Sequence, residues 1–133
     1  MCGRVAILWT WAELFEMLTL TDTEALPEFD ARYNIAPTAR IWALMPGEDG
    51  KLSPERARWG LIPSWAKEAP KSLLINARAD TIDEKPSFRG AFRHGRCLMP
   101  ADAFYEWKAK GGGPKQPFLI RRRDGGSFAM AAI

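Results

Sequence analysis

Short apolar runs alternate with turn residues along most of the chain, and this pattern predicts many short strands. The first run, at residues 4–9, predicts a buried strand. Further strands are predicted at 41–45, 56–59, 96–99, 103–107 and 118–122, with another strand or extended piece at 73–75. Glycine-rich clusters at 46–50, 111–114 and 124–126 predict turns between strands.

Two segments have helical spacing instead. Thr10 and Glu13 fit a capping box, which predicts a helix that starts directly after Thr10. The apolar side chains that would face the core from this helix are Trp11, Leu14, Phe15 and Leu18. A second short helix is predicted at 87–94 from the spacing of Phe88 and Phe92. The acidic segment 21–33 is predicted to be irregular and to lead into a structured loop at 34–38.

This pattern predicts an α+β fold, a β-rich barrel-type domain with short flanking helices. The 133 residues are enough for one domain, 1–133, with a real core. The final apolar run at 128–133 predicts a buried strand. Because domain termini usually lie at the surface, we expect that the C-terminal part of the domain is missing.

Composition narrows the class of protein. The chain has no apolar stretch as long as a membrane span and no signal-peptide pattern, so we expect a cytoplasmic protein. Its two cysteines, Cys2 and Cys97, form neither a metal-ligand spacing nor a disulfide framework, and we expect no metal. Cys97 lies in an apolar run, which favours a buried core thiol.

The net charge of +3 is modest but unevenly distributed. Basic residues cluster at 89–96 and again at 121–123. Each cluster alone is typical of a solvated face. Together with the six tryptophans, the clusters suggest a single-stranded nucleic acid partner as an alternative. Proteins that bind single strands combine cationic grooves with aromatic rings on which the bases stack.

Cys2 carries the most distinctive chemistry. Loss of Met1 would leave an α-amine and a thiol on adjacent carbons, and roughly a quarter of such an amine is neutral at physiological pH. When one of these groups attacks the carbon of an aldehyde, the other can then bond to the same carbon, which gives a five-membered thiazolidine ring. We expect Gly3 to permit close approach of a ligand, and Arg4 to favour the thiolate.

Several motifs in one order resemble the SOS response-associated peptidase (SRAP) family. They are Cys2-Gly3-Arg4, RYNIAPT at 32–38, WGLIPSW at 59–65, INARADT at 75–81, and RCLMPA at 96–101 with FYEW at 104–107. The resemblance covers essentially the whole chain, as the N-terminal two thirds of the family domain. It implies a β-rich domain with a positively charged DNA cleft and no metal or cofactor.

The resemblance also implies an activity. Family members bind abasic sites in single-stranded DNA and crosslink to the abasic aldehyde through the N-terminal cysteine, which is a lyase-type chemistry. The peptidase (hydrolase) label refers to removal of the initiator methionine, by self-processing or by an aminopeptidase. We therefore expect a DNA-damage response protein that is nucleoid-associated when bound to DNA.

By motif position, the resemblance implies three catalytic residues. Cys2 is the nucleophile, Asn76 orients the Cys2 amine or the sugar, and Glu106 transfers protons. The implied DNA-binding residues are Gly3, Arg4, Asn34, Pro37, Trp65, Arg78 and Trp107. The family's catalytic histidine belongs to a motif beyond residue 133, and His94 is not assigned that role.

Simpler interpretations stay open for some of these residues. Asn76 could cap a turn, and Glu106 could be a solvated carboxylate on a strand. Arg78 could pair with Asp80 or Asp83, and Trp107 could belong to the core. For the chain as a whole, the alternative is a truncated, non-catalytic single-stranded-DNA-binding remnant, or one that self-associates through the strand at 128–133.

Overall fold

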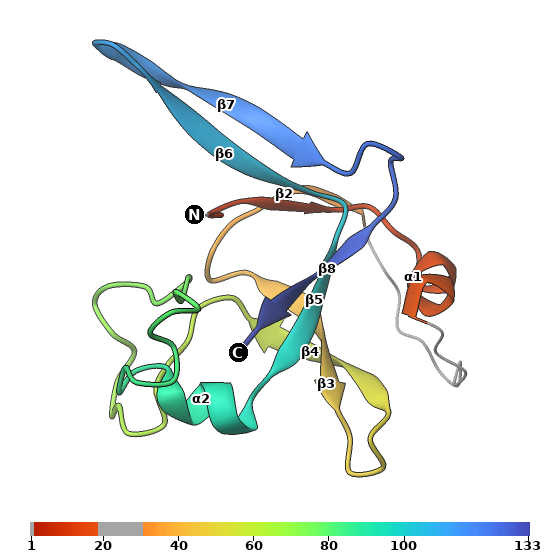
Figure 1. Cartoon of the computed structure of the whole chain (residues 1–133), viewed down its shortest axis with the longest axis vertical. Helices are drawn as coiled ribbons and strands as arrows, with labels where there is room; N and C mark the ends of the chain where they lie inside the picture. Colours follow the sequence, from red (N-terminus) through yellow and green to blue (C-terminus); the bar gives the residue numbers. More distant parts are fainter. Residues whose placement is uncertain (1, 19–30) are drawn as a thin grey trace. The chain divides into compact units, whose positions relative to one another are not determined.

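The computed structural model describes residues 2–18 and 31–133, and Figure 1 shows the path of the chain. Most of the acidic segment predicted at 21–33 lies outside the described residues. Within them short strands predominate, which confirms the β-rich α+β prediction. The elements in chain order are β1 (Val5–Ile7), α1 (Trp11–Leu18), β2 (Arg32–Ile35), β3 (Arg40–Pro46), β4 (Leu52–Arg58), α2 (Arg89–His94), β5 (Cys97–Ala101), β6 (Ala103–Lys110), β7 (Gly113–Arg121) and β8 (Phe128–Ala132).

The chain divides into two compact units. The first unit comprises Met1–Ala36 and Pro100–Ala129, and the second comprises Pro37–Met99 and Met130–Ile133. Each unit therefore combines segments that are far apart in the sequence. Organisation as a single domain over 1–133 stays a prediction.

In the first unit, an antiparallel sheet has the strand order β2-β1-β6-β7. All three residues of β1 are buried, as expected for a short apolar strand with neighbours on both sides. Val5 pairs with Ile35 of β2 on one side and with Phe104 of β6 on the other. β6 and β7 continue together as a hairpin, drawn as the long ribbon in Figure 1.

The predicted capping box at the start of α1 is confirmed. The Thr10 backbone N–H donates to Glu13 Oε2 at 2.6 Å, and the Glu13 N–H donates to Thr10 Oγ1 at 3.3 Å. These bonds satisfy two backbone donors that the first helical turn leaves without partners. The helix buries Trp11, Leu14 and Phe15, as its apolar spacing predicted.

The second unit contains a hairpin formed by β3 and β4. This hairpin belongs to the sheet with strand order β4-β3-β5-β8. β3 and β4 pair continuously from Arg40 opposite Arg58 to Pro46 opposite Leu52. The predicted turn at 46–50 joins them, and its Gly47 N–H donates to the Lys51 carbonyl at 2.7 Å. The core side chains that β3 contributes are Ile41, Ala43 and Leu44.

Several sequence predictions need correction. The strands form two four-stranded sheets rather than a closed barrel over the described residues. Residues 32–35 form a strand where a loop was expected, because β1 offers a pairing partner. The strand at 128–132 alternates between half-buried and exposed residues, since β8 is a sheet edge. Cys97 is half-buried rather than fully enclosed.

Candidate active site

Residues 2–4 lead from the N-terminus into β1 and are held beside β6. The Arg4 carbonyl accepts a hydrogen bond from the Tyr105 backbone N–H at 2.9 Å. The same carbonyl accepts a hydrogen bond from the Cys2 thiol, whose Sγ lies 3.3 Å from the carbonyl oxygen. The pairing of the two strands therefore fixes the position of the candidate nucleophile.

Glu106 lies next to this segment. Because Arg4 is bonded to Tyr105, the next residues along the two strands are Gly3 and Glu106. Burial is the main cause that raises the pKa of the Cys2 thiol, and the negative charge of Glu106 raises the same pKa further. The hydrogen bond to Arg4 opposes both effects. The net result is a thiol that stays protonated at neutral pH, within the electrostatic reach of a carboxylate.

The hydrogen bond to Arg4 lowers the pKa of the Cys2 thiol, which is the direction that the sequence predicted, but the cause is the Arg4 backbone rather than its positive charge. The Arg4 guanidinium donates to Asn34 Oδ1 on β2 at 2.8 Å, and Arg4 acts on the Cys2 thiol only through its carbonyl. This contact brings two predicted DNA-binding residues together. Because the pair is exposed to solvent, the guanidinium keeps donors available for an anion.

Gly3 leaves space beside the candidate nucleophile. A Cβ atom built at this position would have no atom within 4 Å. The expectation that Gly3 allows a ligand to approach closely is therefore compatible with the space around it.

Tyr105 is a contributor that the sequence patterns did not single out. Its hydroxyl donates to the Tyr33 carbonyl on β2 at 2.9 Å, so that its side chain reaches across β1. Its ring centroid lies 6.4 Å from that of Trp107. Trp107 itself is 40% exposed, which disfavours the core interpretation and leaves part of its indole accessible. The motif FYEW pointed to this strand, but not to the hydroxyl contact.

The second unit holds Pro37, Trp65, Asn76 and Arg78. Asn76 is half-buried and directly follows the extended piece predicted at 73–75, which forms only an isolated bridge between Leu61 and Leu74. The Trp59 indole N–H donates to the Ile75 carbonyl at 3.5 Å. These contacts fix the backbone that leads into Asn76 without a regular strand.

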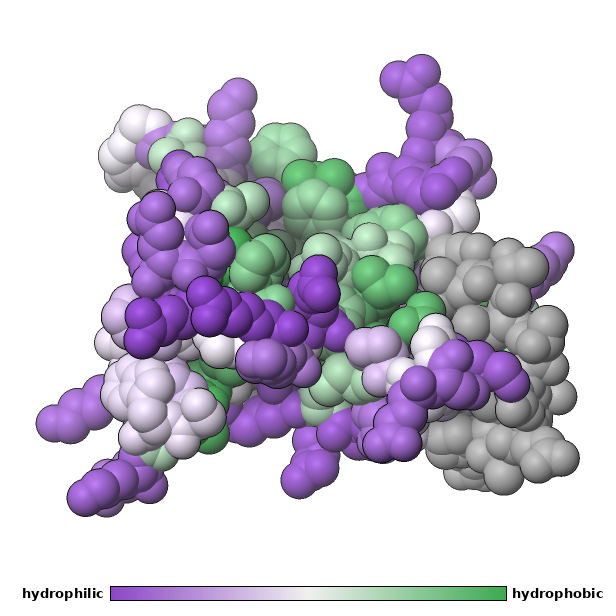
Figure 2. All heavy atoms as spheres, turned by 60° about the horizontal axis from the view of Figure 1, so that its bottom comes forward, coloured by the Kyte–Doolittle hydropathy of each residue, from purple (hydrophilic) through white to green (hydrophobic). Residues whose placement is uncertain are grey.

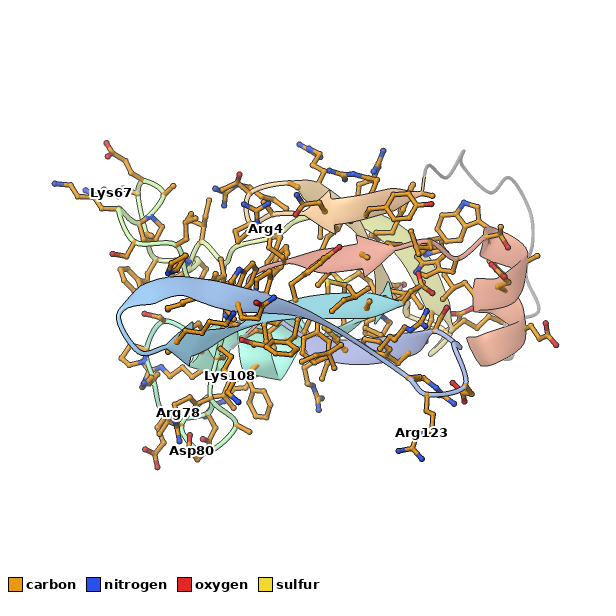
Figure 3. All side chains as sticks on the ribbon, turned by 90° about the horizontal axis from the view of Figure 1, so that it is seen from above. Arg4, Lys67, Arg78, Asp80, Lys108 and Arg123 are labelled. Atoms are coloured by element: carbon orange, nitrogen blue, oxygen red, sulfur yellow. The ribbon has the colours of Figure 1, made fainter. Side chains whose placement is uncertain are left out.

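Arg78 forms an ion pair with Asp80, which the sequence analysis named as the simpler alternative to a DNA contact. Its guanidinium donates to both carboxylate oxygens of Asp80, at 3.1 and 2.7 Å. Figure 3 shows the two side chains together. The pair is well exposed, and exposed ion pairs add little to the stability of a fold, so a phosphate could compete for this guanidinium.

Pro37 and Thr38 begin the second unit with an unusual backbone. Thr38 has a φ of 76°, which is rare for a β-branched residue, and its N–H donates to the Trp59 carbonyl at 2.7 Å. The half-buried Pro37 precedes this residue. The loop is thus held by a backbone contact to the motif at 59–65.

The structure brings together Cys2, Gly3, Arg4, Asn34, Glu106 and Trp107 in the first unit. Among the described residues, no cluster of three or more His, Cys, Asp or Glu side chains is arranged to hold a metal ion. No helix in the described part of the chain is long and apolar enough to cross a membrane. The first unit thus places a thiol, a carboxylate and a guanidinium on neighbouring strands.

Comparison with known proteins identifies the family. The sequence profile of the SOS response associated peptidase (SRAP) family matches residues 1–133, and the chain belongs to this family. It is 37% identical over 135 residues to the abasic site processing protein YoaM of Bacillus subtilis, covering 100% of this chain and 59% of YoaM. It is 38% identical over 136 residues to the abasic site processing protein YedK of Escherichia coli, again covering 100% of this chain and 59% of the relative.

A solved structure supports the fold. The crystal structure of a phage-related protein from Bordetella bronchiseptica matches with a TM-score of 0.78 at 30% identity, over 98% of this chain and 59% of that one. The chain thus spans about three fifths of the length of these relatives.

Proposed function

We propose that this protein processes abasic sites in single-stranded DNA by forming a covalent crosslink through Cys2. The observation that carries the proposal is the half-buried Cys2 thiol within the electrostatic reach of Glu106, on strands that hydrogen bonding holds together. The names of YoaM and YedK as abasic site processing proteins support it.

The proposed chemistry needs no external reagent. After loss of Met1, by self-processing or an aminopeptidase, the Cys2 amine attacks the aldehyde of the ring-opened abasic sugar. The resulting carbinolamine loses water to give an imine, and the Glu106 carboxylate takes the proton released by the attacking nitrogen and passes it to the departing oxygen. The Cys2 sulfur then bonds to the imine carbon while its proton passes to nitrogen. The product is a thiazolidine, with one water released overall.

A protonated thiol suits this order of events. Because the pKa of Cys2 is raised, the amine is the group that attacks first and the sulfur closes the ring afterwards. Asn76 is assigned the orientation of the amine or the sugar. Arg4 and Arg78 would bind phosphates, while Trp65 and Trp107 offer partly exposed rings to the bases.

Intact-mass spectrometry of the full chain with a single-stranded abasic oligonucleotide tests the proposal. We expect an adduct whose mass is the sum of the Met1-processed protein and the DNA, less one water. Cys2→Ala should abolish this adduct, and Cys97→Ala should leave it unchanged. An adduct of equal yield in Cys2→Ala would overturn the proposal.

Glu106→Gln separates proton transfer from binding. The amide cannot donate the proton required in the dehydration step, so adduct formation should slow by a factor of about 10²–10⁴. Affinity for undamaged single-stranded DNA should stay close to that of the wild type. A crosslinking rate equal to that of the wild type would remove Glu106 from the mechanism.

A second candidate function is self-association without catalysis. Three consecutive residues of the edge strand β7, at positions 118–120, are large, apolar and exposed. β8, the strand that the sequence analysis associated with self-association, is also a sheet edge. Exposed apolar edge strands are pairing sites for a second chain.

We place the protein in the cytoplasm, and on the nucleoid when it is bound to DNA.

A further inference from the structure

Tyr105 contacts the residues around the candidate nucleophile through both its backbone and its side chain. Its backbone N–H donates to the Arg4 carbonyl at 2.9 Å. Its hydroxyl donates to the Tyr33 carbonyl at 2.9 Å, on the far side of β1. One residue of β6 is thus bonded to the segment that carries Cys2 and to the strand β2 beyond it.

These contacts belong to a closed set of hydrogen bonds. The Tyr33 carbonyl shares a planar peptide group with the N–H of Asn34, so the hydroxyl bond restrains the backbone from which the Asn34 side chain extends. Asn34 Oδ1 accepts a hydrogen bond from the Arg4 guanidinium at 2.8 Å. The Arg4 carbonyl in turn accepts the Tyr105 N–H and the Cys2 thiol. Figure 3 shows Arg4 where β1 begins, next to β2.

The hydroxyl bond reaches β2 at an irregular point of the sheet. The register of β1 and β2 shifts between Val5 and Ile7, so that Tyr33 and Asn34 both lie opposite Ala6. Two residues opposite one form a β-bulge, which disrupts the ladder locally and changes the direction of its side chains. β2 is also the edge strand of its sheet, so the ladder holds this bulge from one side only. The hydroxyl bond therefore restrains β2 where the ladder is weakest.

We infer that Tyr105 is a positioning residue for the reaction with abasic DNA. Its hydroxyl holds the bulge at Tyr33 and Asn34, and Asn34 then directs the Arg4 guanidinium toward a phosphate of the DNA strand. The inference rests on the proposed function, in which Arg4 binds a phosphate. Tyr105 contacts neither the phosphate nor the aldehyde in this role and acts through Arg4.

Tyr105→Phe isolates the hydroxyl, because it keeps the ring that lies beside Trp107. At limiting concentrations, crosslinking to an abasic single-stranded oligonucleotide should slow by roughly 2- to 13-fold, the range for the net value of one hydrogen bond. Free 2-deoxyribose offers the same aldehyde without a phosphate, so its adduct with Cys2 should form at the rate of the wild type. Intact-mass spectrometry over time measures both rates.

A double-mutant comparison tests the route through Arg4. Asn34→Ala removes the acceptor and should slow crosslinking to abasic DNA in the same way. Combining Tyr105→Phe with Arg4→Ala should be no slower than Arg4→Ala alone, because residues that act through one another have non-additive effects. Ser127→Ala is the matched control, since it removes another hydroxyl hydrogen bond of the first unit, to Asp102, and should leave both rates unchanged.

The outcomes separate this inference from the proposed function. A Tyr105→Phe variant that crosslinks abasic DNA like the wild type, or whose loss adds in full to that of Arg4→Ala, overturns the positioning role and leaves the proposed function standing. Equal slowing with DNA and with 2-deoxyribose would place the effect at Cys2 and also overturn this role.

A wild type that forms no adduct with abasic DNA would instead overturn the proposed chemistry. The positioning role is then decided by fluorescence anisotropy with undamaged oligo-dT, which requires the phosphate contact alone. Tyr105→Phe should weaken this binding within the same roughly 2- to 13-fold range, and only while Arg4 is present. Binding equal to that of the wild type would contradict the positioning role.

Discussion

At the scale of single residues, the candidate nucleophile depends on a balance of local effects. Burial and the Glu106 charge raise the pKa of Cys2, while the Arg4 carbonyl contact lowers it. Only the thiolate reacts with an alkylating agent, so its reaction rate reports this balance. The effect of Glu106 can be isolated because glutamine keeps the shape of the side chain and removes its charge.

Glu106→Gln should lower the pKa of Cys2. At any fixed pH below that pKa, a larger fraction of Cys2 would be thiolate, and alkylation by iodoacetamide would be faster than in the wild type. The rate of the wild type should keep rising above the pH at which an ordinary cysteine levels off. Peptide mapping of the alkylated full chain over a pH series measures both profiles.

Cys97 is the internal control for this experiment. Its pKa is raised by burial alone, with no contribution from Glu106. Its alkylation profile should therefore be the same in wild type and Glu106→Gln. An equal shift of both cysteines would point to loosening of the fold, and an unchanged Cys2 profile would contradict the electrostatic effect of Glu106 on the Cys2 thiol.

At the scale of elements, the start of α1 shows how a local sequence signal becomes structure. Hydrogen bonding to Thr10, first from its backbone N–H and then from its hydroxyl, lowers the pKa of Glu13. A lowered pKa in the folded state stabilises it above the unfolded pKa, and this contribution is lost as the pH falls through the folded value. The capping box therefore favours folding at neutral pH and weakens in acid.

Thr10→Ala should lower the free energy of unfolding by about 1 kcal/mol at neutral pH, because the helix loses its N-terminal cap. Thr10→Ser keeps the hydroxyl and should stay within a few tenths of a kcal/mol of the wild type. Urea denaturation at neutral and acidic pH measures the effect, and the difference between the two variants should shrink in acid. An equal loss in both variants would show that the threonine methyl group, rather than the cap, is responsible.

Elements with local signals could be predicted, and those that depend on a distant partner could not. The strand β1, the helix α1 and the turn at 46–50 follow from apolar runs, a capping box and glycine. β2 was missed because only its pairing with β1 makes it a strand. β4 begins earlier than predicted, since an edge strand tolerates Pro54.

The candidate site shows the same limit. The family motifs pointed to Cys2, Asn76 and Glu106, but no local pattern could show that β6 pairs beside residues 2–4. That register makes Glu106 a neighbour of the thiol. The Arg4 guanidinium is bonded to Asn34 on β2, so that Arg4 acts on the thiol through its backbone rather than through its charge.

Gly60 tests how the motif at 59–65 is shaped. Its φ of 132° lies in a region that suits only glycine, and a Cβ there would lie 3.2 Å from Arg58 Nη1. Gly60→Ala should therefore lower the free energy of unfolding by about 1–3 kcal/mol. Gly111→Ala, where a Cβ has no atom within 4 Å, should have a much smaller effect in the same urea denaturation. Equal stability of the two variants would contradict the backbone requirement at Gly60.

At the scale of the whole molecule, the two sheets leave edges that carry apolar side chains. β7 and β8 are each the last strand of their sheet. On β7, Phe118 and Leu119 are 49% and 52% exposed. On the face that Figure 2 shows, where the bottom of Figure 1 is brought forward, apolar residues drawn in green also reach the surface. A second copy that pairs along such an edge would satisfy free backbone groups and cover these side chains together.

The edge of β7 should therefore make association depend on concentration. Sedimentation velocity of the wild type over a concentration series should show a growing dimer fraction, because pairing removes Phe118 and Leu119 from water. Leu119→Lys places a charge on this edge and should keep the protein monomeric, whereas Ala12→Lys adds the same charge at an exposed position of α1 and should behave like the wild type. A wild type that sediments as a monomer at every concentration would contradict the edge pairing. A dimer that persists in Leu119→Lys would exclude β7 as the contact and move it to another edge strand, with β8 as the next candidate.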